Sequence, residues 1–386
     1  MVKRLFITCL FFLQNAYAEP YVIPNEPSIA AQSYILIDYY TGQILSSNNE
    51  HKQYPPASLT KIMTSYALGQ ELKKGFVSLD DEVTISKNAW AQNPLFNGSS
   101  VMWIEVGKTV RLADLEKGLI IQSGNDASVA IAEHIAGSAS AYVDLMNAWA
   151  KNIGMENTYF QNVHGLDEEK QYTSAYDMAL LTRRFIQDFP TIYAVYSEKE
   201  YTYNGIKQYN RNGLLWDTSL NVDGVKTGHT DEAGYSIVTS AYIDNMRLIS
   251  VIIGANSIRQ RELQSKKLLS YGFRFFETVR LYQKNDTFIT NEIWFGNSKE
   301  VELGFDQDIT LTIYRGQADN IVSSFEIHKT LEAPLKKGEE VGTIYFLLGD
   351  KEIASFPLVI LNDVKKGSLF SQIYDYIHLL IRHIIE

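Results

Sequence analysis

Residues 55–64 read Pro-Pro-Ala-Ser-Leu-Thr-Lys-Ile-Met-Thr, and this stretch opens a helix. The prolines stop the preceding segment, and a helical pattern begins at Ser58. Ser58 and Lys61 stand three positions apart, so their side chains share one face of that helix. The first turn of a helix favours negative charge, which a serine oxygen develops when it attacks a carbonyl. The stretch therefore predicts a serine nucleophile beside a lysine base, whose pKa must be lowered by burial or by another cation.

A second motif, Lys226-Thr227-Gly228, follows a strand-like run, and no other Lys-Ser/Thr-Gly occurs in the chain. It adds weight because a serine and a lysine with the first spacing arise by chance about once in a chain of this length. We expect Lys226 to be the cation that lowers the pKa of Lys61. Thr227 offers a hydroxyl to a substrate carboxylate, and Gly228 leaves room for substrate backbone at a strand edge.

A third motif, Ser123-Gly-Asn125, lies in a polar break between helical stretches at 111–121 and 126–135. Ser-x-Asn also occurs at 47–49 and 219–221, so the pattern alone proves nothing. Only the copy at 123 lies both in such a break and between the other two motifs. This segment also reads as an ordinary cap for the second helical stretch, and a cap is compatible with a role in the site.

The composition excludes several other kinds of site. The formal charge of −10 argues against the broad basic surface of a nucleic-acid-binding protein. None of the seven histidines forms a His-Glu-x-x-His pair and no glycine-rich phosphate loop occurs, so we expect no metal, nucleotide or other cofactor. A single cysteine, Cys9, excludes an intrachain disulfide.

Residues 1–18 have the layout of a signal peptide for export. Two basic residues precede an apolar run at 5–13, and Ala-Tyr-Ala at 16–18 provides a cleavage site. The alternative, a membrane-spanning anchor, needs about 20 apolar residues, roughly twice this run. We therefore expect an exported protein that loses Cys9 with its signal, so that the nucleophile is an oxygen.

The rest of the chain mixes helices and strands and then becomes all β. A hairpin is predicted at 33–47, and two antiparallel strands are predicted at 235–242 and 246–253. Beyond about residue 282, short strand-like runs separated by Gly, Asn or Asp predict a small β unit. These runs cover 287–295, 309–314, 321–327, 341–347 and 354–360.

The last residues, 365–386, have the pattern of an amphipathic helix. Such a helix can dock on its own domain or lie in the surface of a membrane, and aromatic residues at 370, 374 and 376 favour the membrane. The apolar positions that recur at helical spacing are Leu369, Phe370, Ile373, Ile377, Leu380, Ile381 and Ile384.

In order and spacing, the three motifs resemble those of the penicillin-recognising serine acyltransferases. Their surroundings are similar to low-molecular-weight penicillin-binding proteins of the D-alanyl-D-alanine carboxypeptidase type. The similar stretches are 55–64, 122–128, 212–216 and 221–231. The resemblance implies an α+β fold. Its first part is a β-lactamase/transpeptidase-like catalytic domain at 19–281, which has an antiparallel sheet and helices. A small all-β domain at 282–364 and a membrane-anchor helix at 365–386 follow.

The same resemblance implies a serine-type D-Ala-D-Ala carboxypeptidase, which removes the terminal D-alanine from peptidoglycan stem pentapeptides and is acylated by penicillins and other β-lactams. It implies a periplasmic protein held on the outer face of the cytoplasmic membrane. Arg261 is expected to bind the substrate carboxylate, although Arg259 lies two positions away. The full set of implied roles is a nucleophile at Ser58, a base at Lys61, a proton donor at Ser123, a substrate-amide contact at Asn125, an oxyanion hole from the N–H groups of Ser58 and His229, and carboxylate recognition by Lys226, Thr227 and Arg261 beside Gly228.

Three other functions share parts of this machinery. An endopeptidase that cuts peptidoglycan cross-links uses the same residues, and only the extra domain and helix favour the carboxypeptidase. A β-lactamase needs a base that activates water, in one class a Glu-x-x-Leu-Asn segment between the second and third motifs. The nearest stretch, 217–221, has the wrong acid and ends too close to Lys226. A catalytically silent wall-binding homologue is disfavoured because all three motifs are intact.

Overall fold

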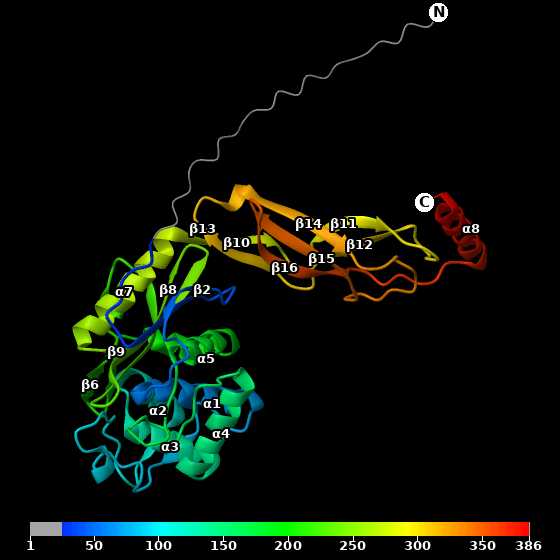
Figure 1. Cartoon of the computed structure of the whole chain (residues 1–386). Coiled ribbons are helices and arrows are strands. Elements are labelled where there is room, and N and C mark those ends of the chain that lie inside the picture. The colour runs from blue at the N-terminus through cyan, green and yellow to red at the C-terminus, as the bar shows by residue number, and fades with distance from the viewer. Residues whose placement is uncertain (1–24, 386) are drawn as a thin grey trace, which may run out of the picture.

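The computed structural model describes residues 25–385, so the predicted signal at 1–18 lies outside the described residues. Figure 1 shows a mixed domain of helices and strands, a β domain that extends from it, and a helix at the far tip. The predicted α+β fold with a later all-β unit is therefore confirmed.

A five-stranded antiparallel sheet forms the centre of the mixed domain. The predicted hairpin and the predicted pair of strands both belong to it and are confirmed. In order across the sheet, the strands are β2 (Ile44–Asn48), β1 (Ser33–Asp38), β9 (Met246–Ala255), β8 (Gly234–Ile243) and β7 (Val222–Thr230).

Both faces of this sheet are covered, which explains why its strands are apolar without strict alternation. Ile35 and Ile37 of β1 belong to the core shared with α5 (Ala175–Asp188). Leu36, between them, points to the opposite core, which contains the buried side of α7 (Ile258–Phe275). Strand β1 is thus buried on both sides, as are most residues of β8 and β9, whereas the outermost strand β2 is partly exposed.

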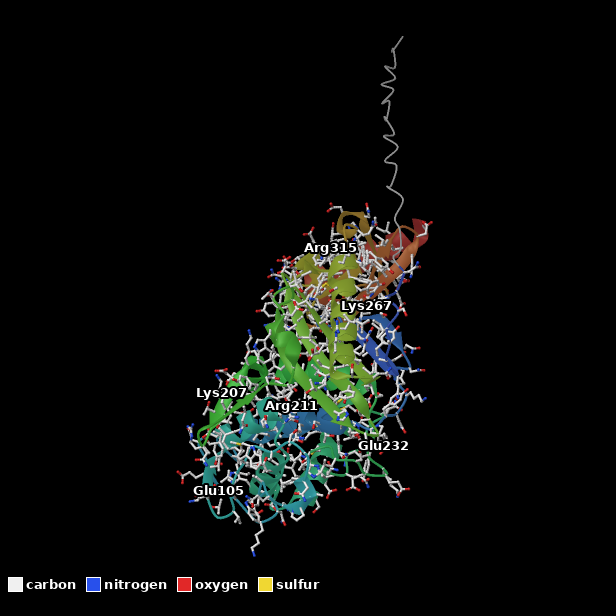
Figure 2. All side chains as sticks on the ribbon, turned by 90° about the vertical axis from the view of Figure 1, so that its left-hand side faces the viewer. Glu105, Lys207, Arg211, Glu232, Lys267 and Arg315 are labelled. Atoms are coloured by element: carbon white, nitrogen blue, oxygen red, sulfur yellow. The ribbon has the colours of Figure 1, made fainter. Side chains whose placement is uncertain are left out.

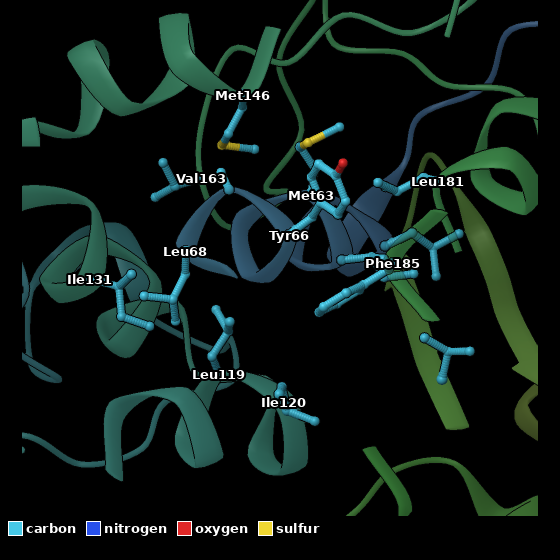
Figure 3. Packing of buried hydrophobic residues seen from close by; sticks show 14 of the residues in the cluster. Met63, Tyr66, Leu68, Leu119, Ile120, Ile131, Met146, Val163, Leu181 and Phe185 are labelled. Atoms are coloured by element: carbon cyan, nitrogen blue, oxygen red, sulfur yellow. The ribbon is translucent and has the colours of Figure 1, made fainter. Parts of the chain in front are cut away.

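Helix α1 (Thr60–Lys74) lies at the centre of the helical layer, and its first twelve residues are all buried. Figure 3 shows its Met63, Tyr66 and Leu68 surrounded by apolar side chains from several helices. Gly75 ends the helix in the left-handed region, at φ 74°, where glycine has no steric penalty. The helices packed around it or nearby are α2 (Leu112–Lys117), α3 (Asn125–Ala136), α4 (Ala139–Ile153), α5 and the short α6 (Pro190–Tyr193).

Two local predictions differ from the structure. Ser58 lies in a 3-10 turn, Ala57–Leu59, that directly precedes α1 rather than in the first turn of the helix itself. The helix predicted over 111–121 is α2 followed by a wider π-helical turn, Gly118–Gln122, because the chain must unwind to place Ser123 in the left-handed region at φ 65°. Two short two-stranded sheets complete the domain. One pairs β3 (Glu82–Thr84) with β4 (Thr109–Arg111), and the other is the hairpin of β5 (Glu200–Tyr203) and β6 (Ile206–Tyr209).

The β domain contains the five predicted runs and two further strands. Its larger sheet has the order β11 (Thr287–Glu292), β12 (Glu300–Gly304), β16 (Lys351–Ile360), β15 (Glu340–Leu348) and β14 (Ile321–Ile327), and a separate pair joins β10 (Phe276–Tyr282) to β13 (Ile309–Tyr314). The helix at the tip is α8 (Leu369–Ile385). Within residues 25–385, no helix is both long enough and apolar enough to cross a membrane.

A buried carboxylate links the two domains. Asp38, at the end of β1, is fully buried and accepts the N–H groups of Tyr40 (2.7 Å) and Thr41 (3.0 Å) through Oδ1. Its other oxygen accepts the hydroxyl of Thr278 in β10. Thr41 also contacts Thr312 of β13, with 2.6 Å between the hydroxyl oxygens. This cluster fixes how β10 leaves the mixed domain.

We expect Asp38→Ala to lower the free energy of unfolding by about 2–3 kcal/mol, because it leaves two backbone N–H groups and one hydroxyl without their charged acceptor. Urea denaturation followed by tryptophan fluorescence measures the change. Asp38→Asn keeps an acceptor oxygen and should lose less. An unchanged urea midpoint for the alanine variant would show that this carboxylate does not stabilise the junction.

Candidate active site

A pocket of about 750 Å³ lies between the helical layer and strand β7, which is the last strand of its sheet. It brings the three sequence motifs together from positions far apart in the chain. The predicted residues that line it are Ser58, Ser123, Asn125, Thr227, Gly228, His229 and Arg261. The two motif lysines, Lys61 and Lys226, are buried next to these lining residues, with exposed fractions of 0% and 2%.

The amine of Lys61 has three acceptors. Its Nζ lies 3.1 Å from Ser58 Oγ, 2.7 Å from Asn125 Oδ1 and 2.5 Å from the carbonyl oxygen of His164. These acceptors satisfy a group that would otherwise be very costly to bury. They also hold the amine within proton-transfer distance of the serine oxygen. The neutral amine keeps two N–H donors for Asn125 and His164 and turns its lone pair to the Ser58 hydroxyl, which is the geometry that a general base requires.

The surroundings of Lys61 favour its neutral form. Burial lowers the pKa of Lys61 to about 7, the positive charge of Arg211 contributes in the same direction, and Asp126 opposes it. The cation that lowers the pKa of Lys61 is thus Arg211 and not Lys226, the residue predicted from the sequence. The pKa of Lys226 is itself held well below its usual value by burial and by the charges of Lys61, Arg211 and Arg261. At neutral pH a large share of Lys61 is therefore an uncharged amine that can accept a proton.

The break that carries Ser123 and Asn125 is held rigidly. Ser123 is 2% exposed at the end of the π-helical turn. The amide of Asn125 is engaged at both ends, because Oδ1 accepts from Lys61 while Nδ2 donates to Ser99 Oγ at 2.8 Å. The carboxylate of the next residue, Asp126, accepts hydrogen bonds from the backbone N–H groups of residues 102–104 at 2.7–3.3 Å, which fixes the neighbouring loop. Asn125 therefore holds the base in addition to facing the pocket.

Strand β7 approaches the backbone of the nucleophile closely. A Cβ atom at Gly228 would lie 3.2 Å from Cβ of Ala57 and 3.3 Å from the amide nitrogen of Ser58, so a side chain there would push the two segments apart. His229, which follows, is exposed at the pocket and stacks its ring on Tyr235 at 4.0 Å. This approach brings the β7 backbone and the Ser58 N–H to one place, as an oxyanion hole requires.

Cations converge on the same end of the pocket. Arg261 of α7 is 5% exposed and donates to the carbonyl oxygens of Gly228 (3.4 Å) and Arg211 (3.5 Å), whereas Arg259 is exposed and does not line the pocket. Figure 2 shows Arg211 on the face of the domain that also carries Lys207 and Glu232. A negatively charged group of a ligand fits this end.

Two residues that contribute to the site could not be recognised from sequence patterns. Arg211 lines the pocket and affects the pKa of Lys61, but it stands in no spacing relation to the motifs. His164 contributes its backbone carbonyl, while its ring is buried and keeps a pKa lowered to about 3 by burial and by Lys61. In the described part of the chain, no group of three or more His, Cys, Asp or Glu side chains is placed to hold a metal ion.

Comparison with known proteins gives a consistent result over nearly the whole chain. Residues 21–257 match the family model described as D-alanyl-D-alanine carboxypeptidase, and residues 276–366 match the C-terminal domain of penicillin-binding protein 5. A curated relative, the D-alanyl-D-alanine carboxypeptidase DacA of Escherichia coli K12, is 48% identical over 392 residues, which cover 99% of this chain and 97% of the relative.

Solved structures agree. Penicillin-binding protein 5 from Haemophilus influenzae is 45% identical with a TM-score of 0.86, covering 89% of this chain and all of that one. Penicillin-binding protein 6B from E. coli is 41% identical with a TM-score of 0.76, covering 87% of this chain and 97% of that one.

The charge of Arg211 predicts a shift in pH dependence. If neutral Lys61 is the base, the rate of acylation by benzylpenicillin should rise with pH through about 7, because protonated Lys61 cannot accept a proton. Arg211→Ala removes a nearby positive charge, so the pKa of Lys61 should rise by roughly half a unit. The acidic limb of the pH–rate profile, where the rate rises with pH, should move to higher pH by the same amount. Stopped-flow measurement from pH 5 to 9 tests this. Arg259→Ala, also on the surface, should leave the limb in place, and a shift to lower pH in Arg211→Ala would contradict this account.

Proposed function

Because the chain belongs to the D-alanyl-D-alanine carboxypeptidase family, we propose that it uses Ser58 to form the acyl-enzyme of that reaction. The protein is a serine-type D-Ala-D-Ala carboxypeptidase with a penicillin-binding-protein fold, and its substrate is peptidoglycan peptide ending in D-Ala-D-Ala. One observation carries the assignment of Ser58: its Oγ is the hydroxyl 3.1 Å from the buried amine of Lys61.

In the first half of the reaction, Ser58 Oγ attacks the carbonyl carbon of the penultimate D-alanine and its proton passes to Lys61. The N–H groups of Ser58 and His229 stabilise the oxyanion, and each such donor contributes about 2.7–4 kcal/mol in known cases. The peptide C–N bond then breaks, and the amine of the terminal D-alanine takes a proton from Ser123. The proton held on Lys61 replaces the one that Ser123 gives, so that both side chains are restored when D-alanine leaves. The product is an ester between Ser58 and the shortened peptide.

In the second half, water attacks the ester carbonyl and gives a proton to neutral Lys61. As the ester bond breaks, Lys61 returns that proton to Ser58 Oγ, which restores the free enzyme. A β-lactam follows the first half by opening its ring on Ser58. The leaving amine of the opened ring stays covalently attached to the acyl group, so it remains beside the ester and does not diffuse away.

Recognition of the substrate carboxylate falls to Lys226, Thr227 and Arg261, with Arg211 at the rim. The support is the convergence of these side chains at one end of the pocket, and the 3.4 Å contact that ties Arg261 to the Gly228 carbonyl. An extended peptide can pair with the edge of β7 while its terminal carboxylate lies among these cations. A free carboxylate is what separates a carboxypeptidase substrate from an internal peptide bond.

We further propose that the enzyme is exported through residues 1–18, acts in the periplasm in cell-wall biogenesis and cell shape, and is attached to the outer face of the inner membrane by α8. The support is a row of exposed apolar side chains on a helix at the tip of the β domain (Figure 1). A helix of this kind lies in the membrane surface rather than crossing it. The exposed residues are Leu369, Phe370, Ile373, Tyr374, Tyr376, Ile377, Leu380 and Ile381.

A buried acid supports this orientation of α8. Asp375 is 2% exposed and accepts the Phe295 N–H at 2.7 Å and the Lys299 ammonium at 2.7 Å. The segment before the helix also pairs with this loop, since Asn297 N–H donates to the Lys365 carbonyl at 2.8 Å. The polar side of α8 therefore rests on the β domain, and its apolar side faces away.

Replacing Ser58 with Ala should abolish both D-alanine release from defined muropeptides and covalent labelling by a fluorescent penicillin. Mass spectrometry of the muropeptides distinguishes loss of one D-alanine from cleavage of a cross-link. Ser140→Ala, at an exposed serine, is the matched control and should behave as the wild type. Full labelling of Ser58→Ala would disprove the nucleophile, and cleavage of cross-links alone by the wild type would identify an endopeptidase.

Removal of α8 should release the protein from membranes. The cut belongs after Gly367, because Val364 is buried in the β domain and its N–H donates to the Leu335 carbonyl at 2.9 Å. A single Ile377→Asp change should lower partition onto phospholipid vesicles roughly tenfold. His378→Asp, at the neighbouring exposed position, should have a smaller effect. Undiminished sedimentation of the truncated protein with vesicles would exclude α8 as the anchor.

A further inference from the structure

The loop between α4 and α5 supplies the third acceptor of Lys61. It has no helix or strand of its own between residues 160 and 172, yet the carbonyl of His164 lies 2.5 Å from Lys61 Nζ. A carbonyl in an irregular loop has no helix or strand to direct it. Something else must fix the direction of this peptide group.

The carboxamide of Asn162 fixes it. Asn162 Oδ1 accepts the N–H of Gly165 at 2.7 Å and the N–H of His164 at 3.3 Å, while its Nδ2 donates to the Leu166 carbonyl at 2.9 Å. The Gly165 N–H and the His164 C=O belong to the same planar trans peptide group, so they point in opposite directions. Holding the N–H on Asn162 therefore directs the carbonyl toward Lys61.

Gly165 allows the loop to approach the segment of the nucleophile closely. A Cβ atom on this residue would lie 1.9 Å from the carbonyl oxygen of Ala57, and its φ of 91° is in the left-handed region. The loop thus touches the backbone immediately before Ser58. One peptide group is in contact with the nucleophile's segment and with the base.

We propose that Asn162 is a positioning residue for the reaction, which acts by directing the His164 carbonyl so that Lys61 Nζ stays within reach of Ser58 Oγ. This inference rests on the proposed function, in which Lys61 is the base. Asn162 is not among the residues that line the pocket. Gly165 and Leu166, whose backbone groups Asn162 binds, do line it, so Asn162 acts through the backbone of this turn and not by touching the substrate itself.

The charged and titratable groups around Lys61 set the sign of the expected pH effect. They are Lys226 of β7, Arg211, Asp126 of α3 and the ring of His164, which stays neutral at working pH because its pKa is about 3. None of these changes when Asn162 is replaced. A carbonyl acceptor favours the charged ammonium over the neutral amine, so losing its alignment lowers the pKa of Lys61.

The test is the rate of acylation of full-length protein by benzylpenicillin from pH 5 to 9. For Asn162→Ala we expect a maximal rate lower by about tenfold to a hundredfold, since small misplacements of reacting groups have effects of this size. We also expect the acidic limb to move to lower pH. A merely destabilised protein would lose active molecules without moving the limb. Asn162→Asp keeps an acceptor for both N–H groups and should recover most of the maximal rate, while its added negative charge should move the acidic limb to higher pH, opposite to Asn162→Ala.

Asn147 of α4 provides a matched control. Its carboxamide also holds this loop, with Nδ2 donating to the Phe160 carbonyl (2.8 Å) and Oδ1 accepting the Phe160 N–H (2.9 Å), but it does not touch the turn at 164–166. Asn147→Ala should lower thermal stability and leave the limb where it is. The inference is overturned if the limb of Asn162→Ala coincides with that of the wild type, or if Asn147→Ala shifts it equally. Failure of the wild type to be acylated would instead overturn the proposed function.

Discussion

The burial of the Lys61 amine is the constraint on which the catalytic domain depends. A fully buried nitrogen must find hydrogen-bond acceptors, and these come from the turn at Ser58, the break at Asn125 and the loop at His164. The three segments are joined only through the tertiary fold. Each departs from regular structure where it meets the amine, since Ala57 and Ser123 have positive φ and the third segment is a loop. The helical core around α1 holds these departures in place.

The second constraint is the position of β7 at the end of its sheet. An unpaired strand edge invites association with other chains, and proteins usually cover or interrupt it. Here the edge faces a pocket whose opposite wall includes Ser58, and the glycine at 228 keeps the two backbones close. An extended peptide that pairs with this edge has its carbonyl beside the nucleophile and its terminus among the cations. In the proposed reaction, this unpaired edge selects extended substrates.

The motif residues could be predicted because their chemistry needs particular side chains at particular spacings. His164 escaped prediction since it acts through a carbonyl, which every residue has, and Arg211 because only folding brings it to the motifs. Strand β10 was missed because it follows α7 without an intervening turn, at Phe276. The hairpin at 33–47 was clear from its apolar runs and its turn glycine. What the sequence hides is therefore mainly backbone geometry, where residue type carries little information.

The attachment of α8 illustrates how one polar residue can orient an apolar helix. Apolar contacts are non-directional, so a helix held by them alone can rotate or slide on its support. Asp375 instead requires the Phe295 N–H and the Lys299 ammonium, and burial makes the loss of either partner costly. Only one rotation of the helix satisfies that carboxylate. The same rotation leaves the apolar side chains outward, so the direction of the proposed membrane surface is set by a hydrogen bond on the opposite side of the helix.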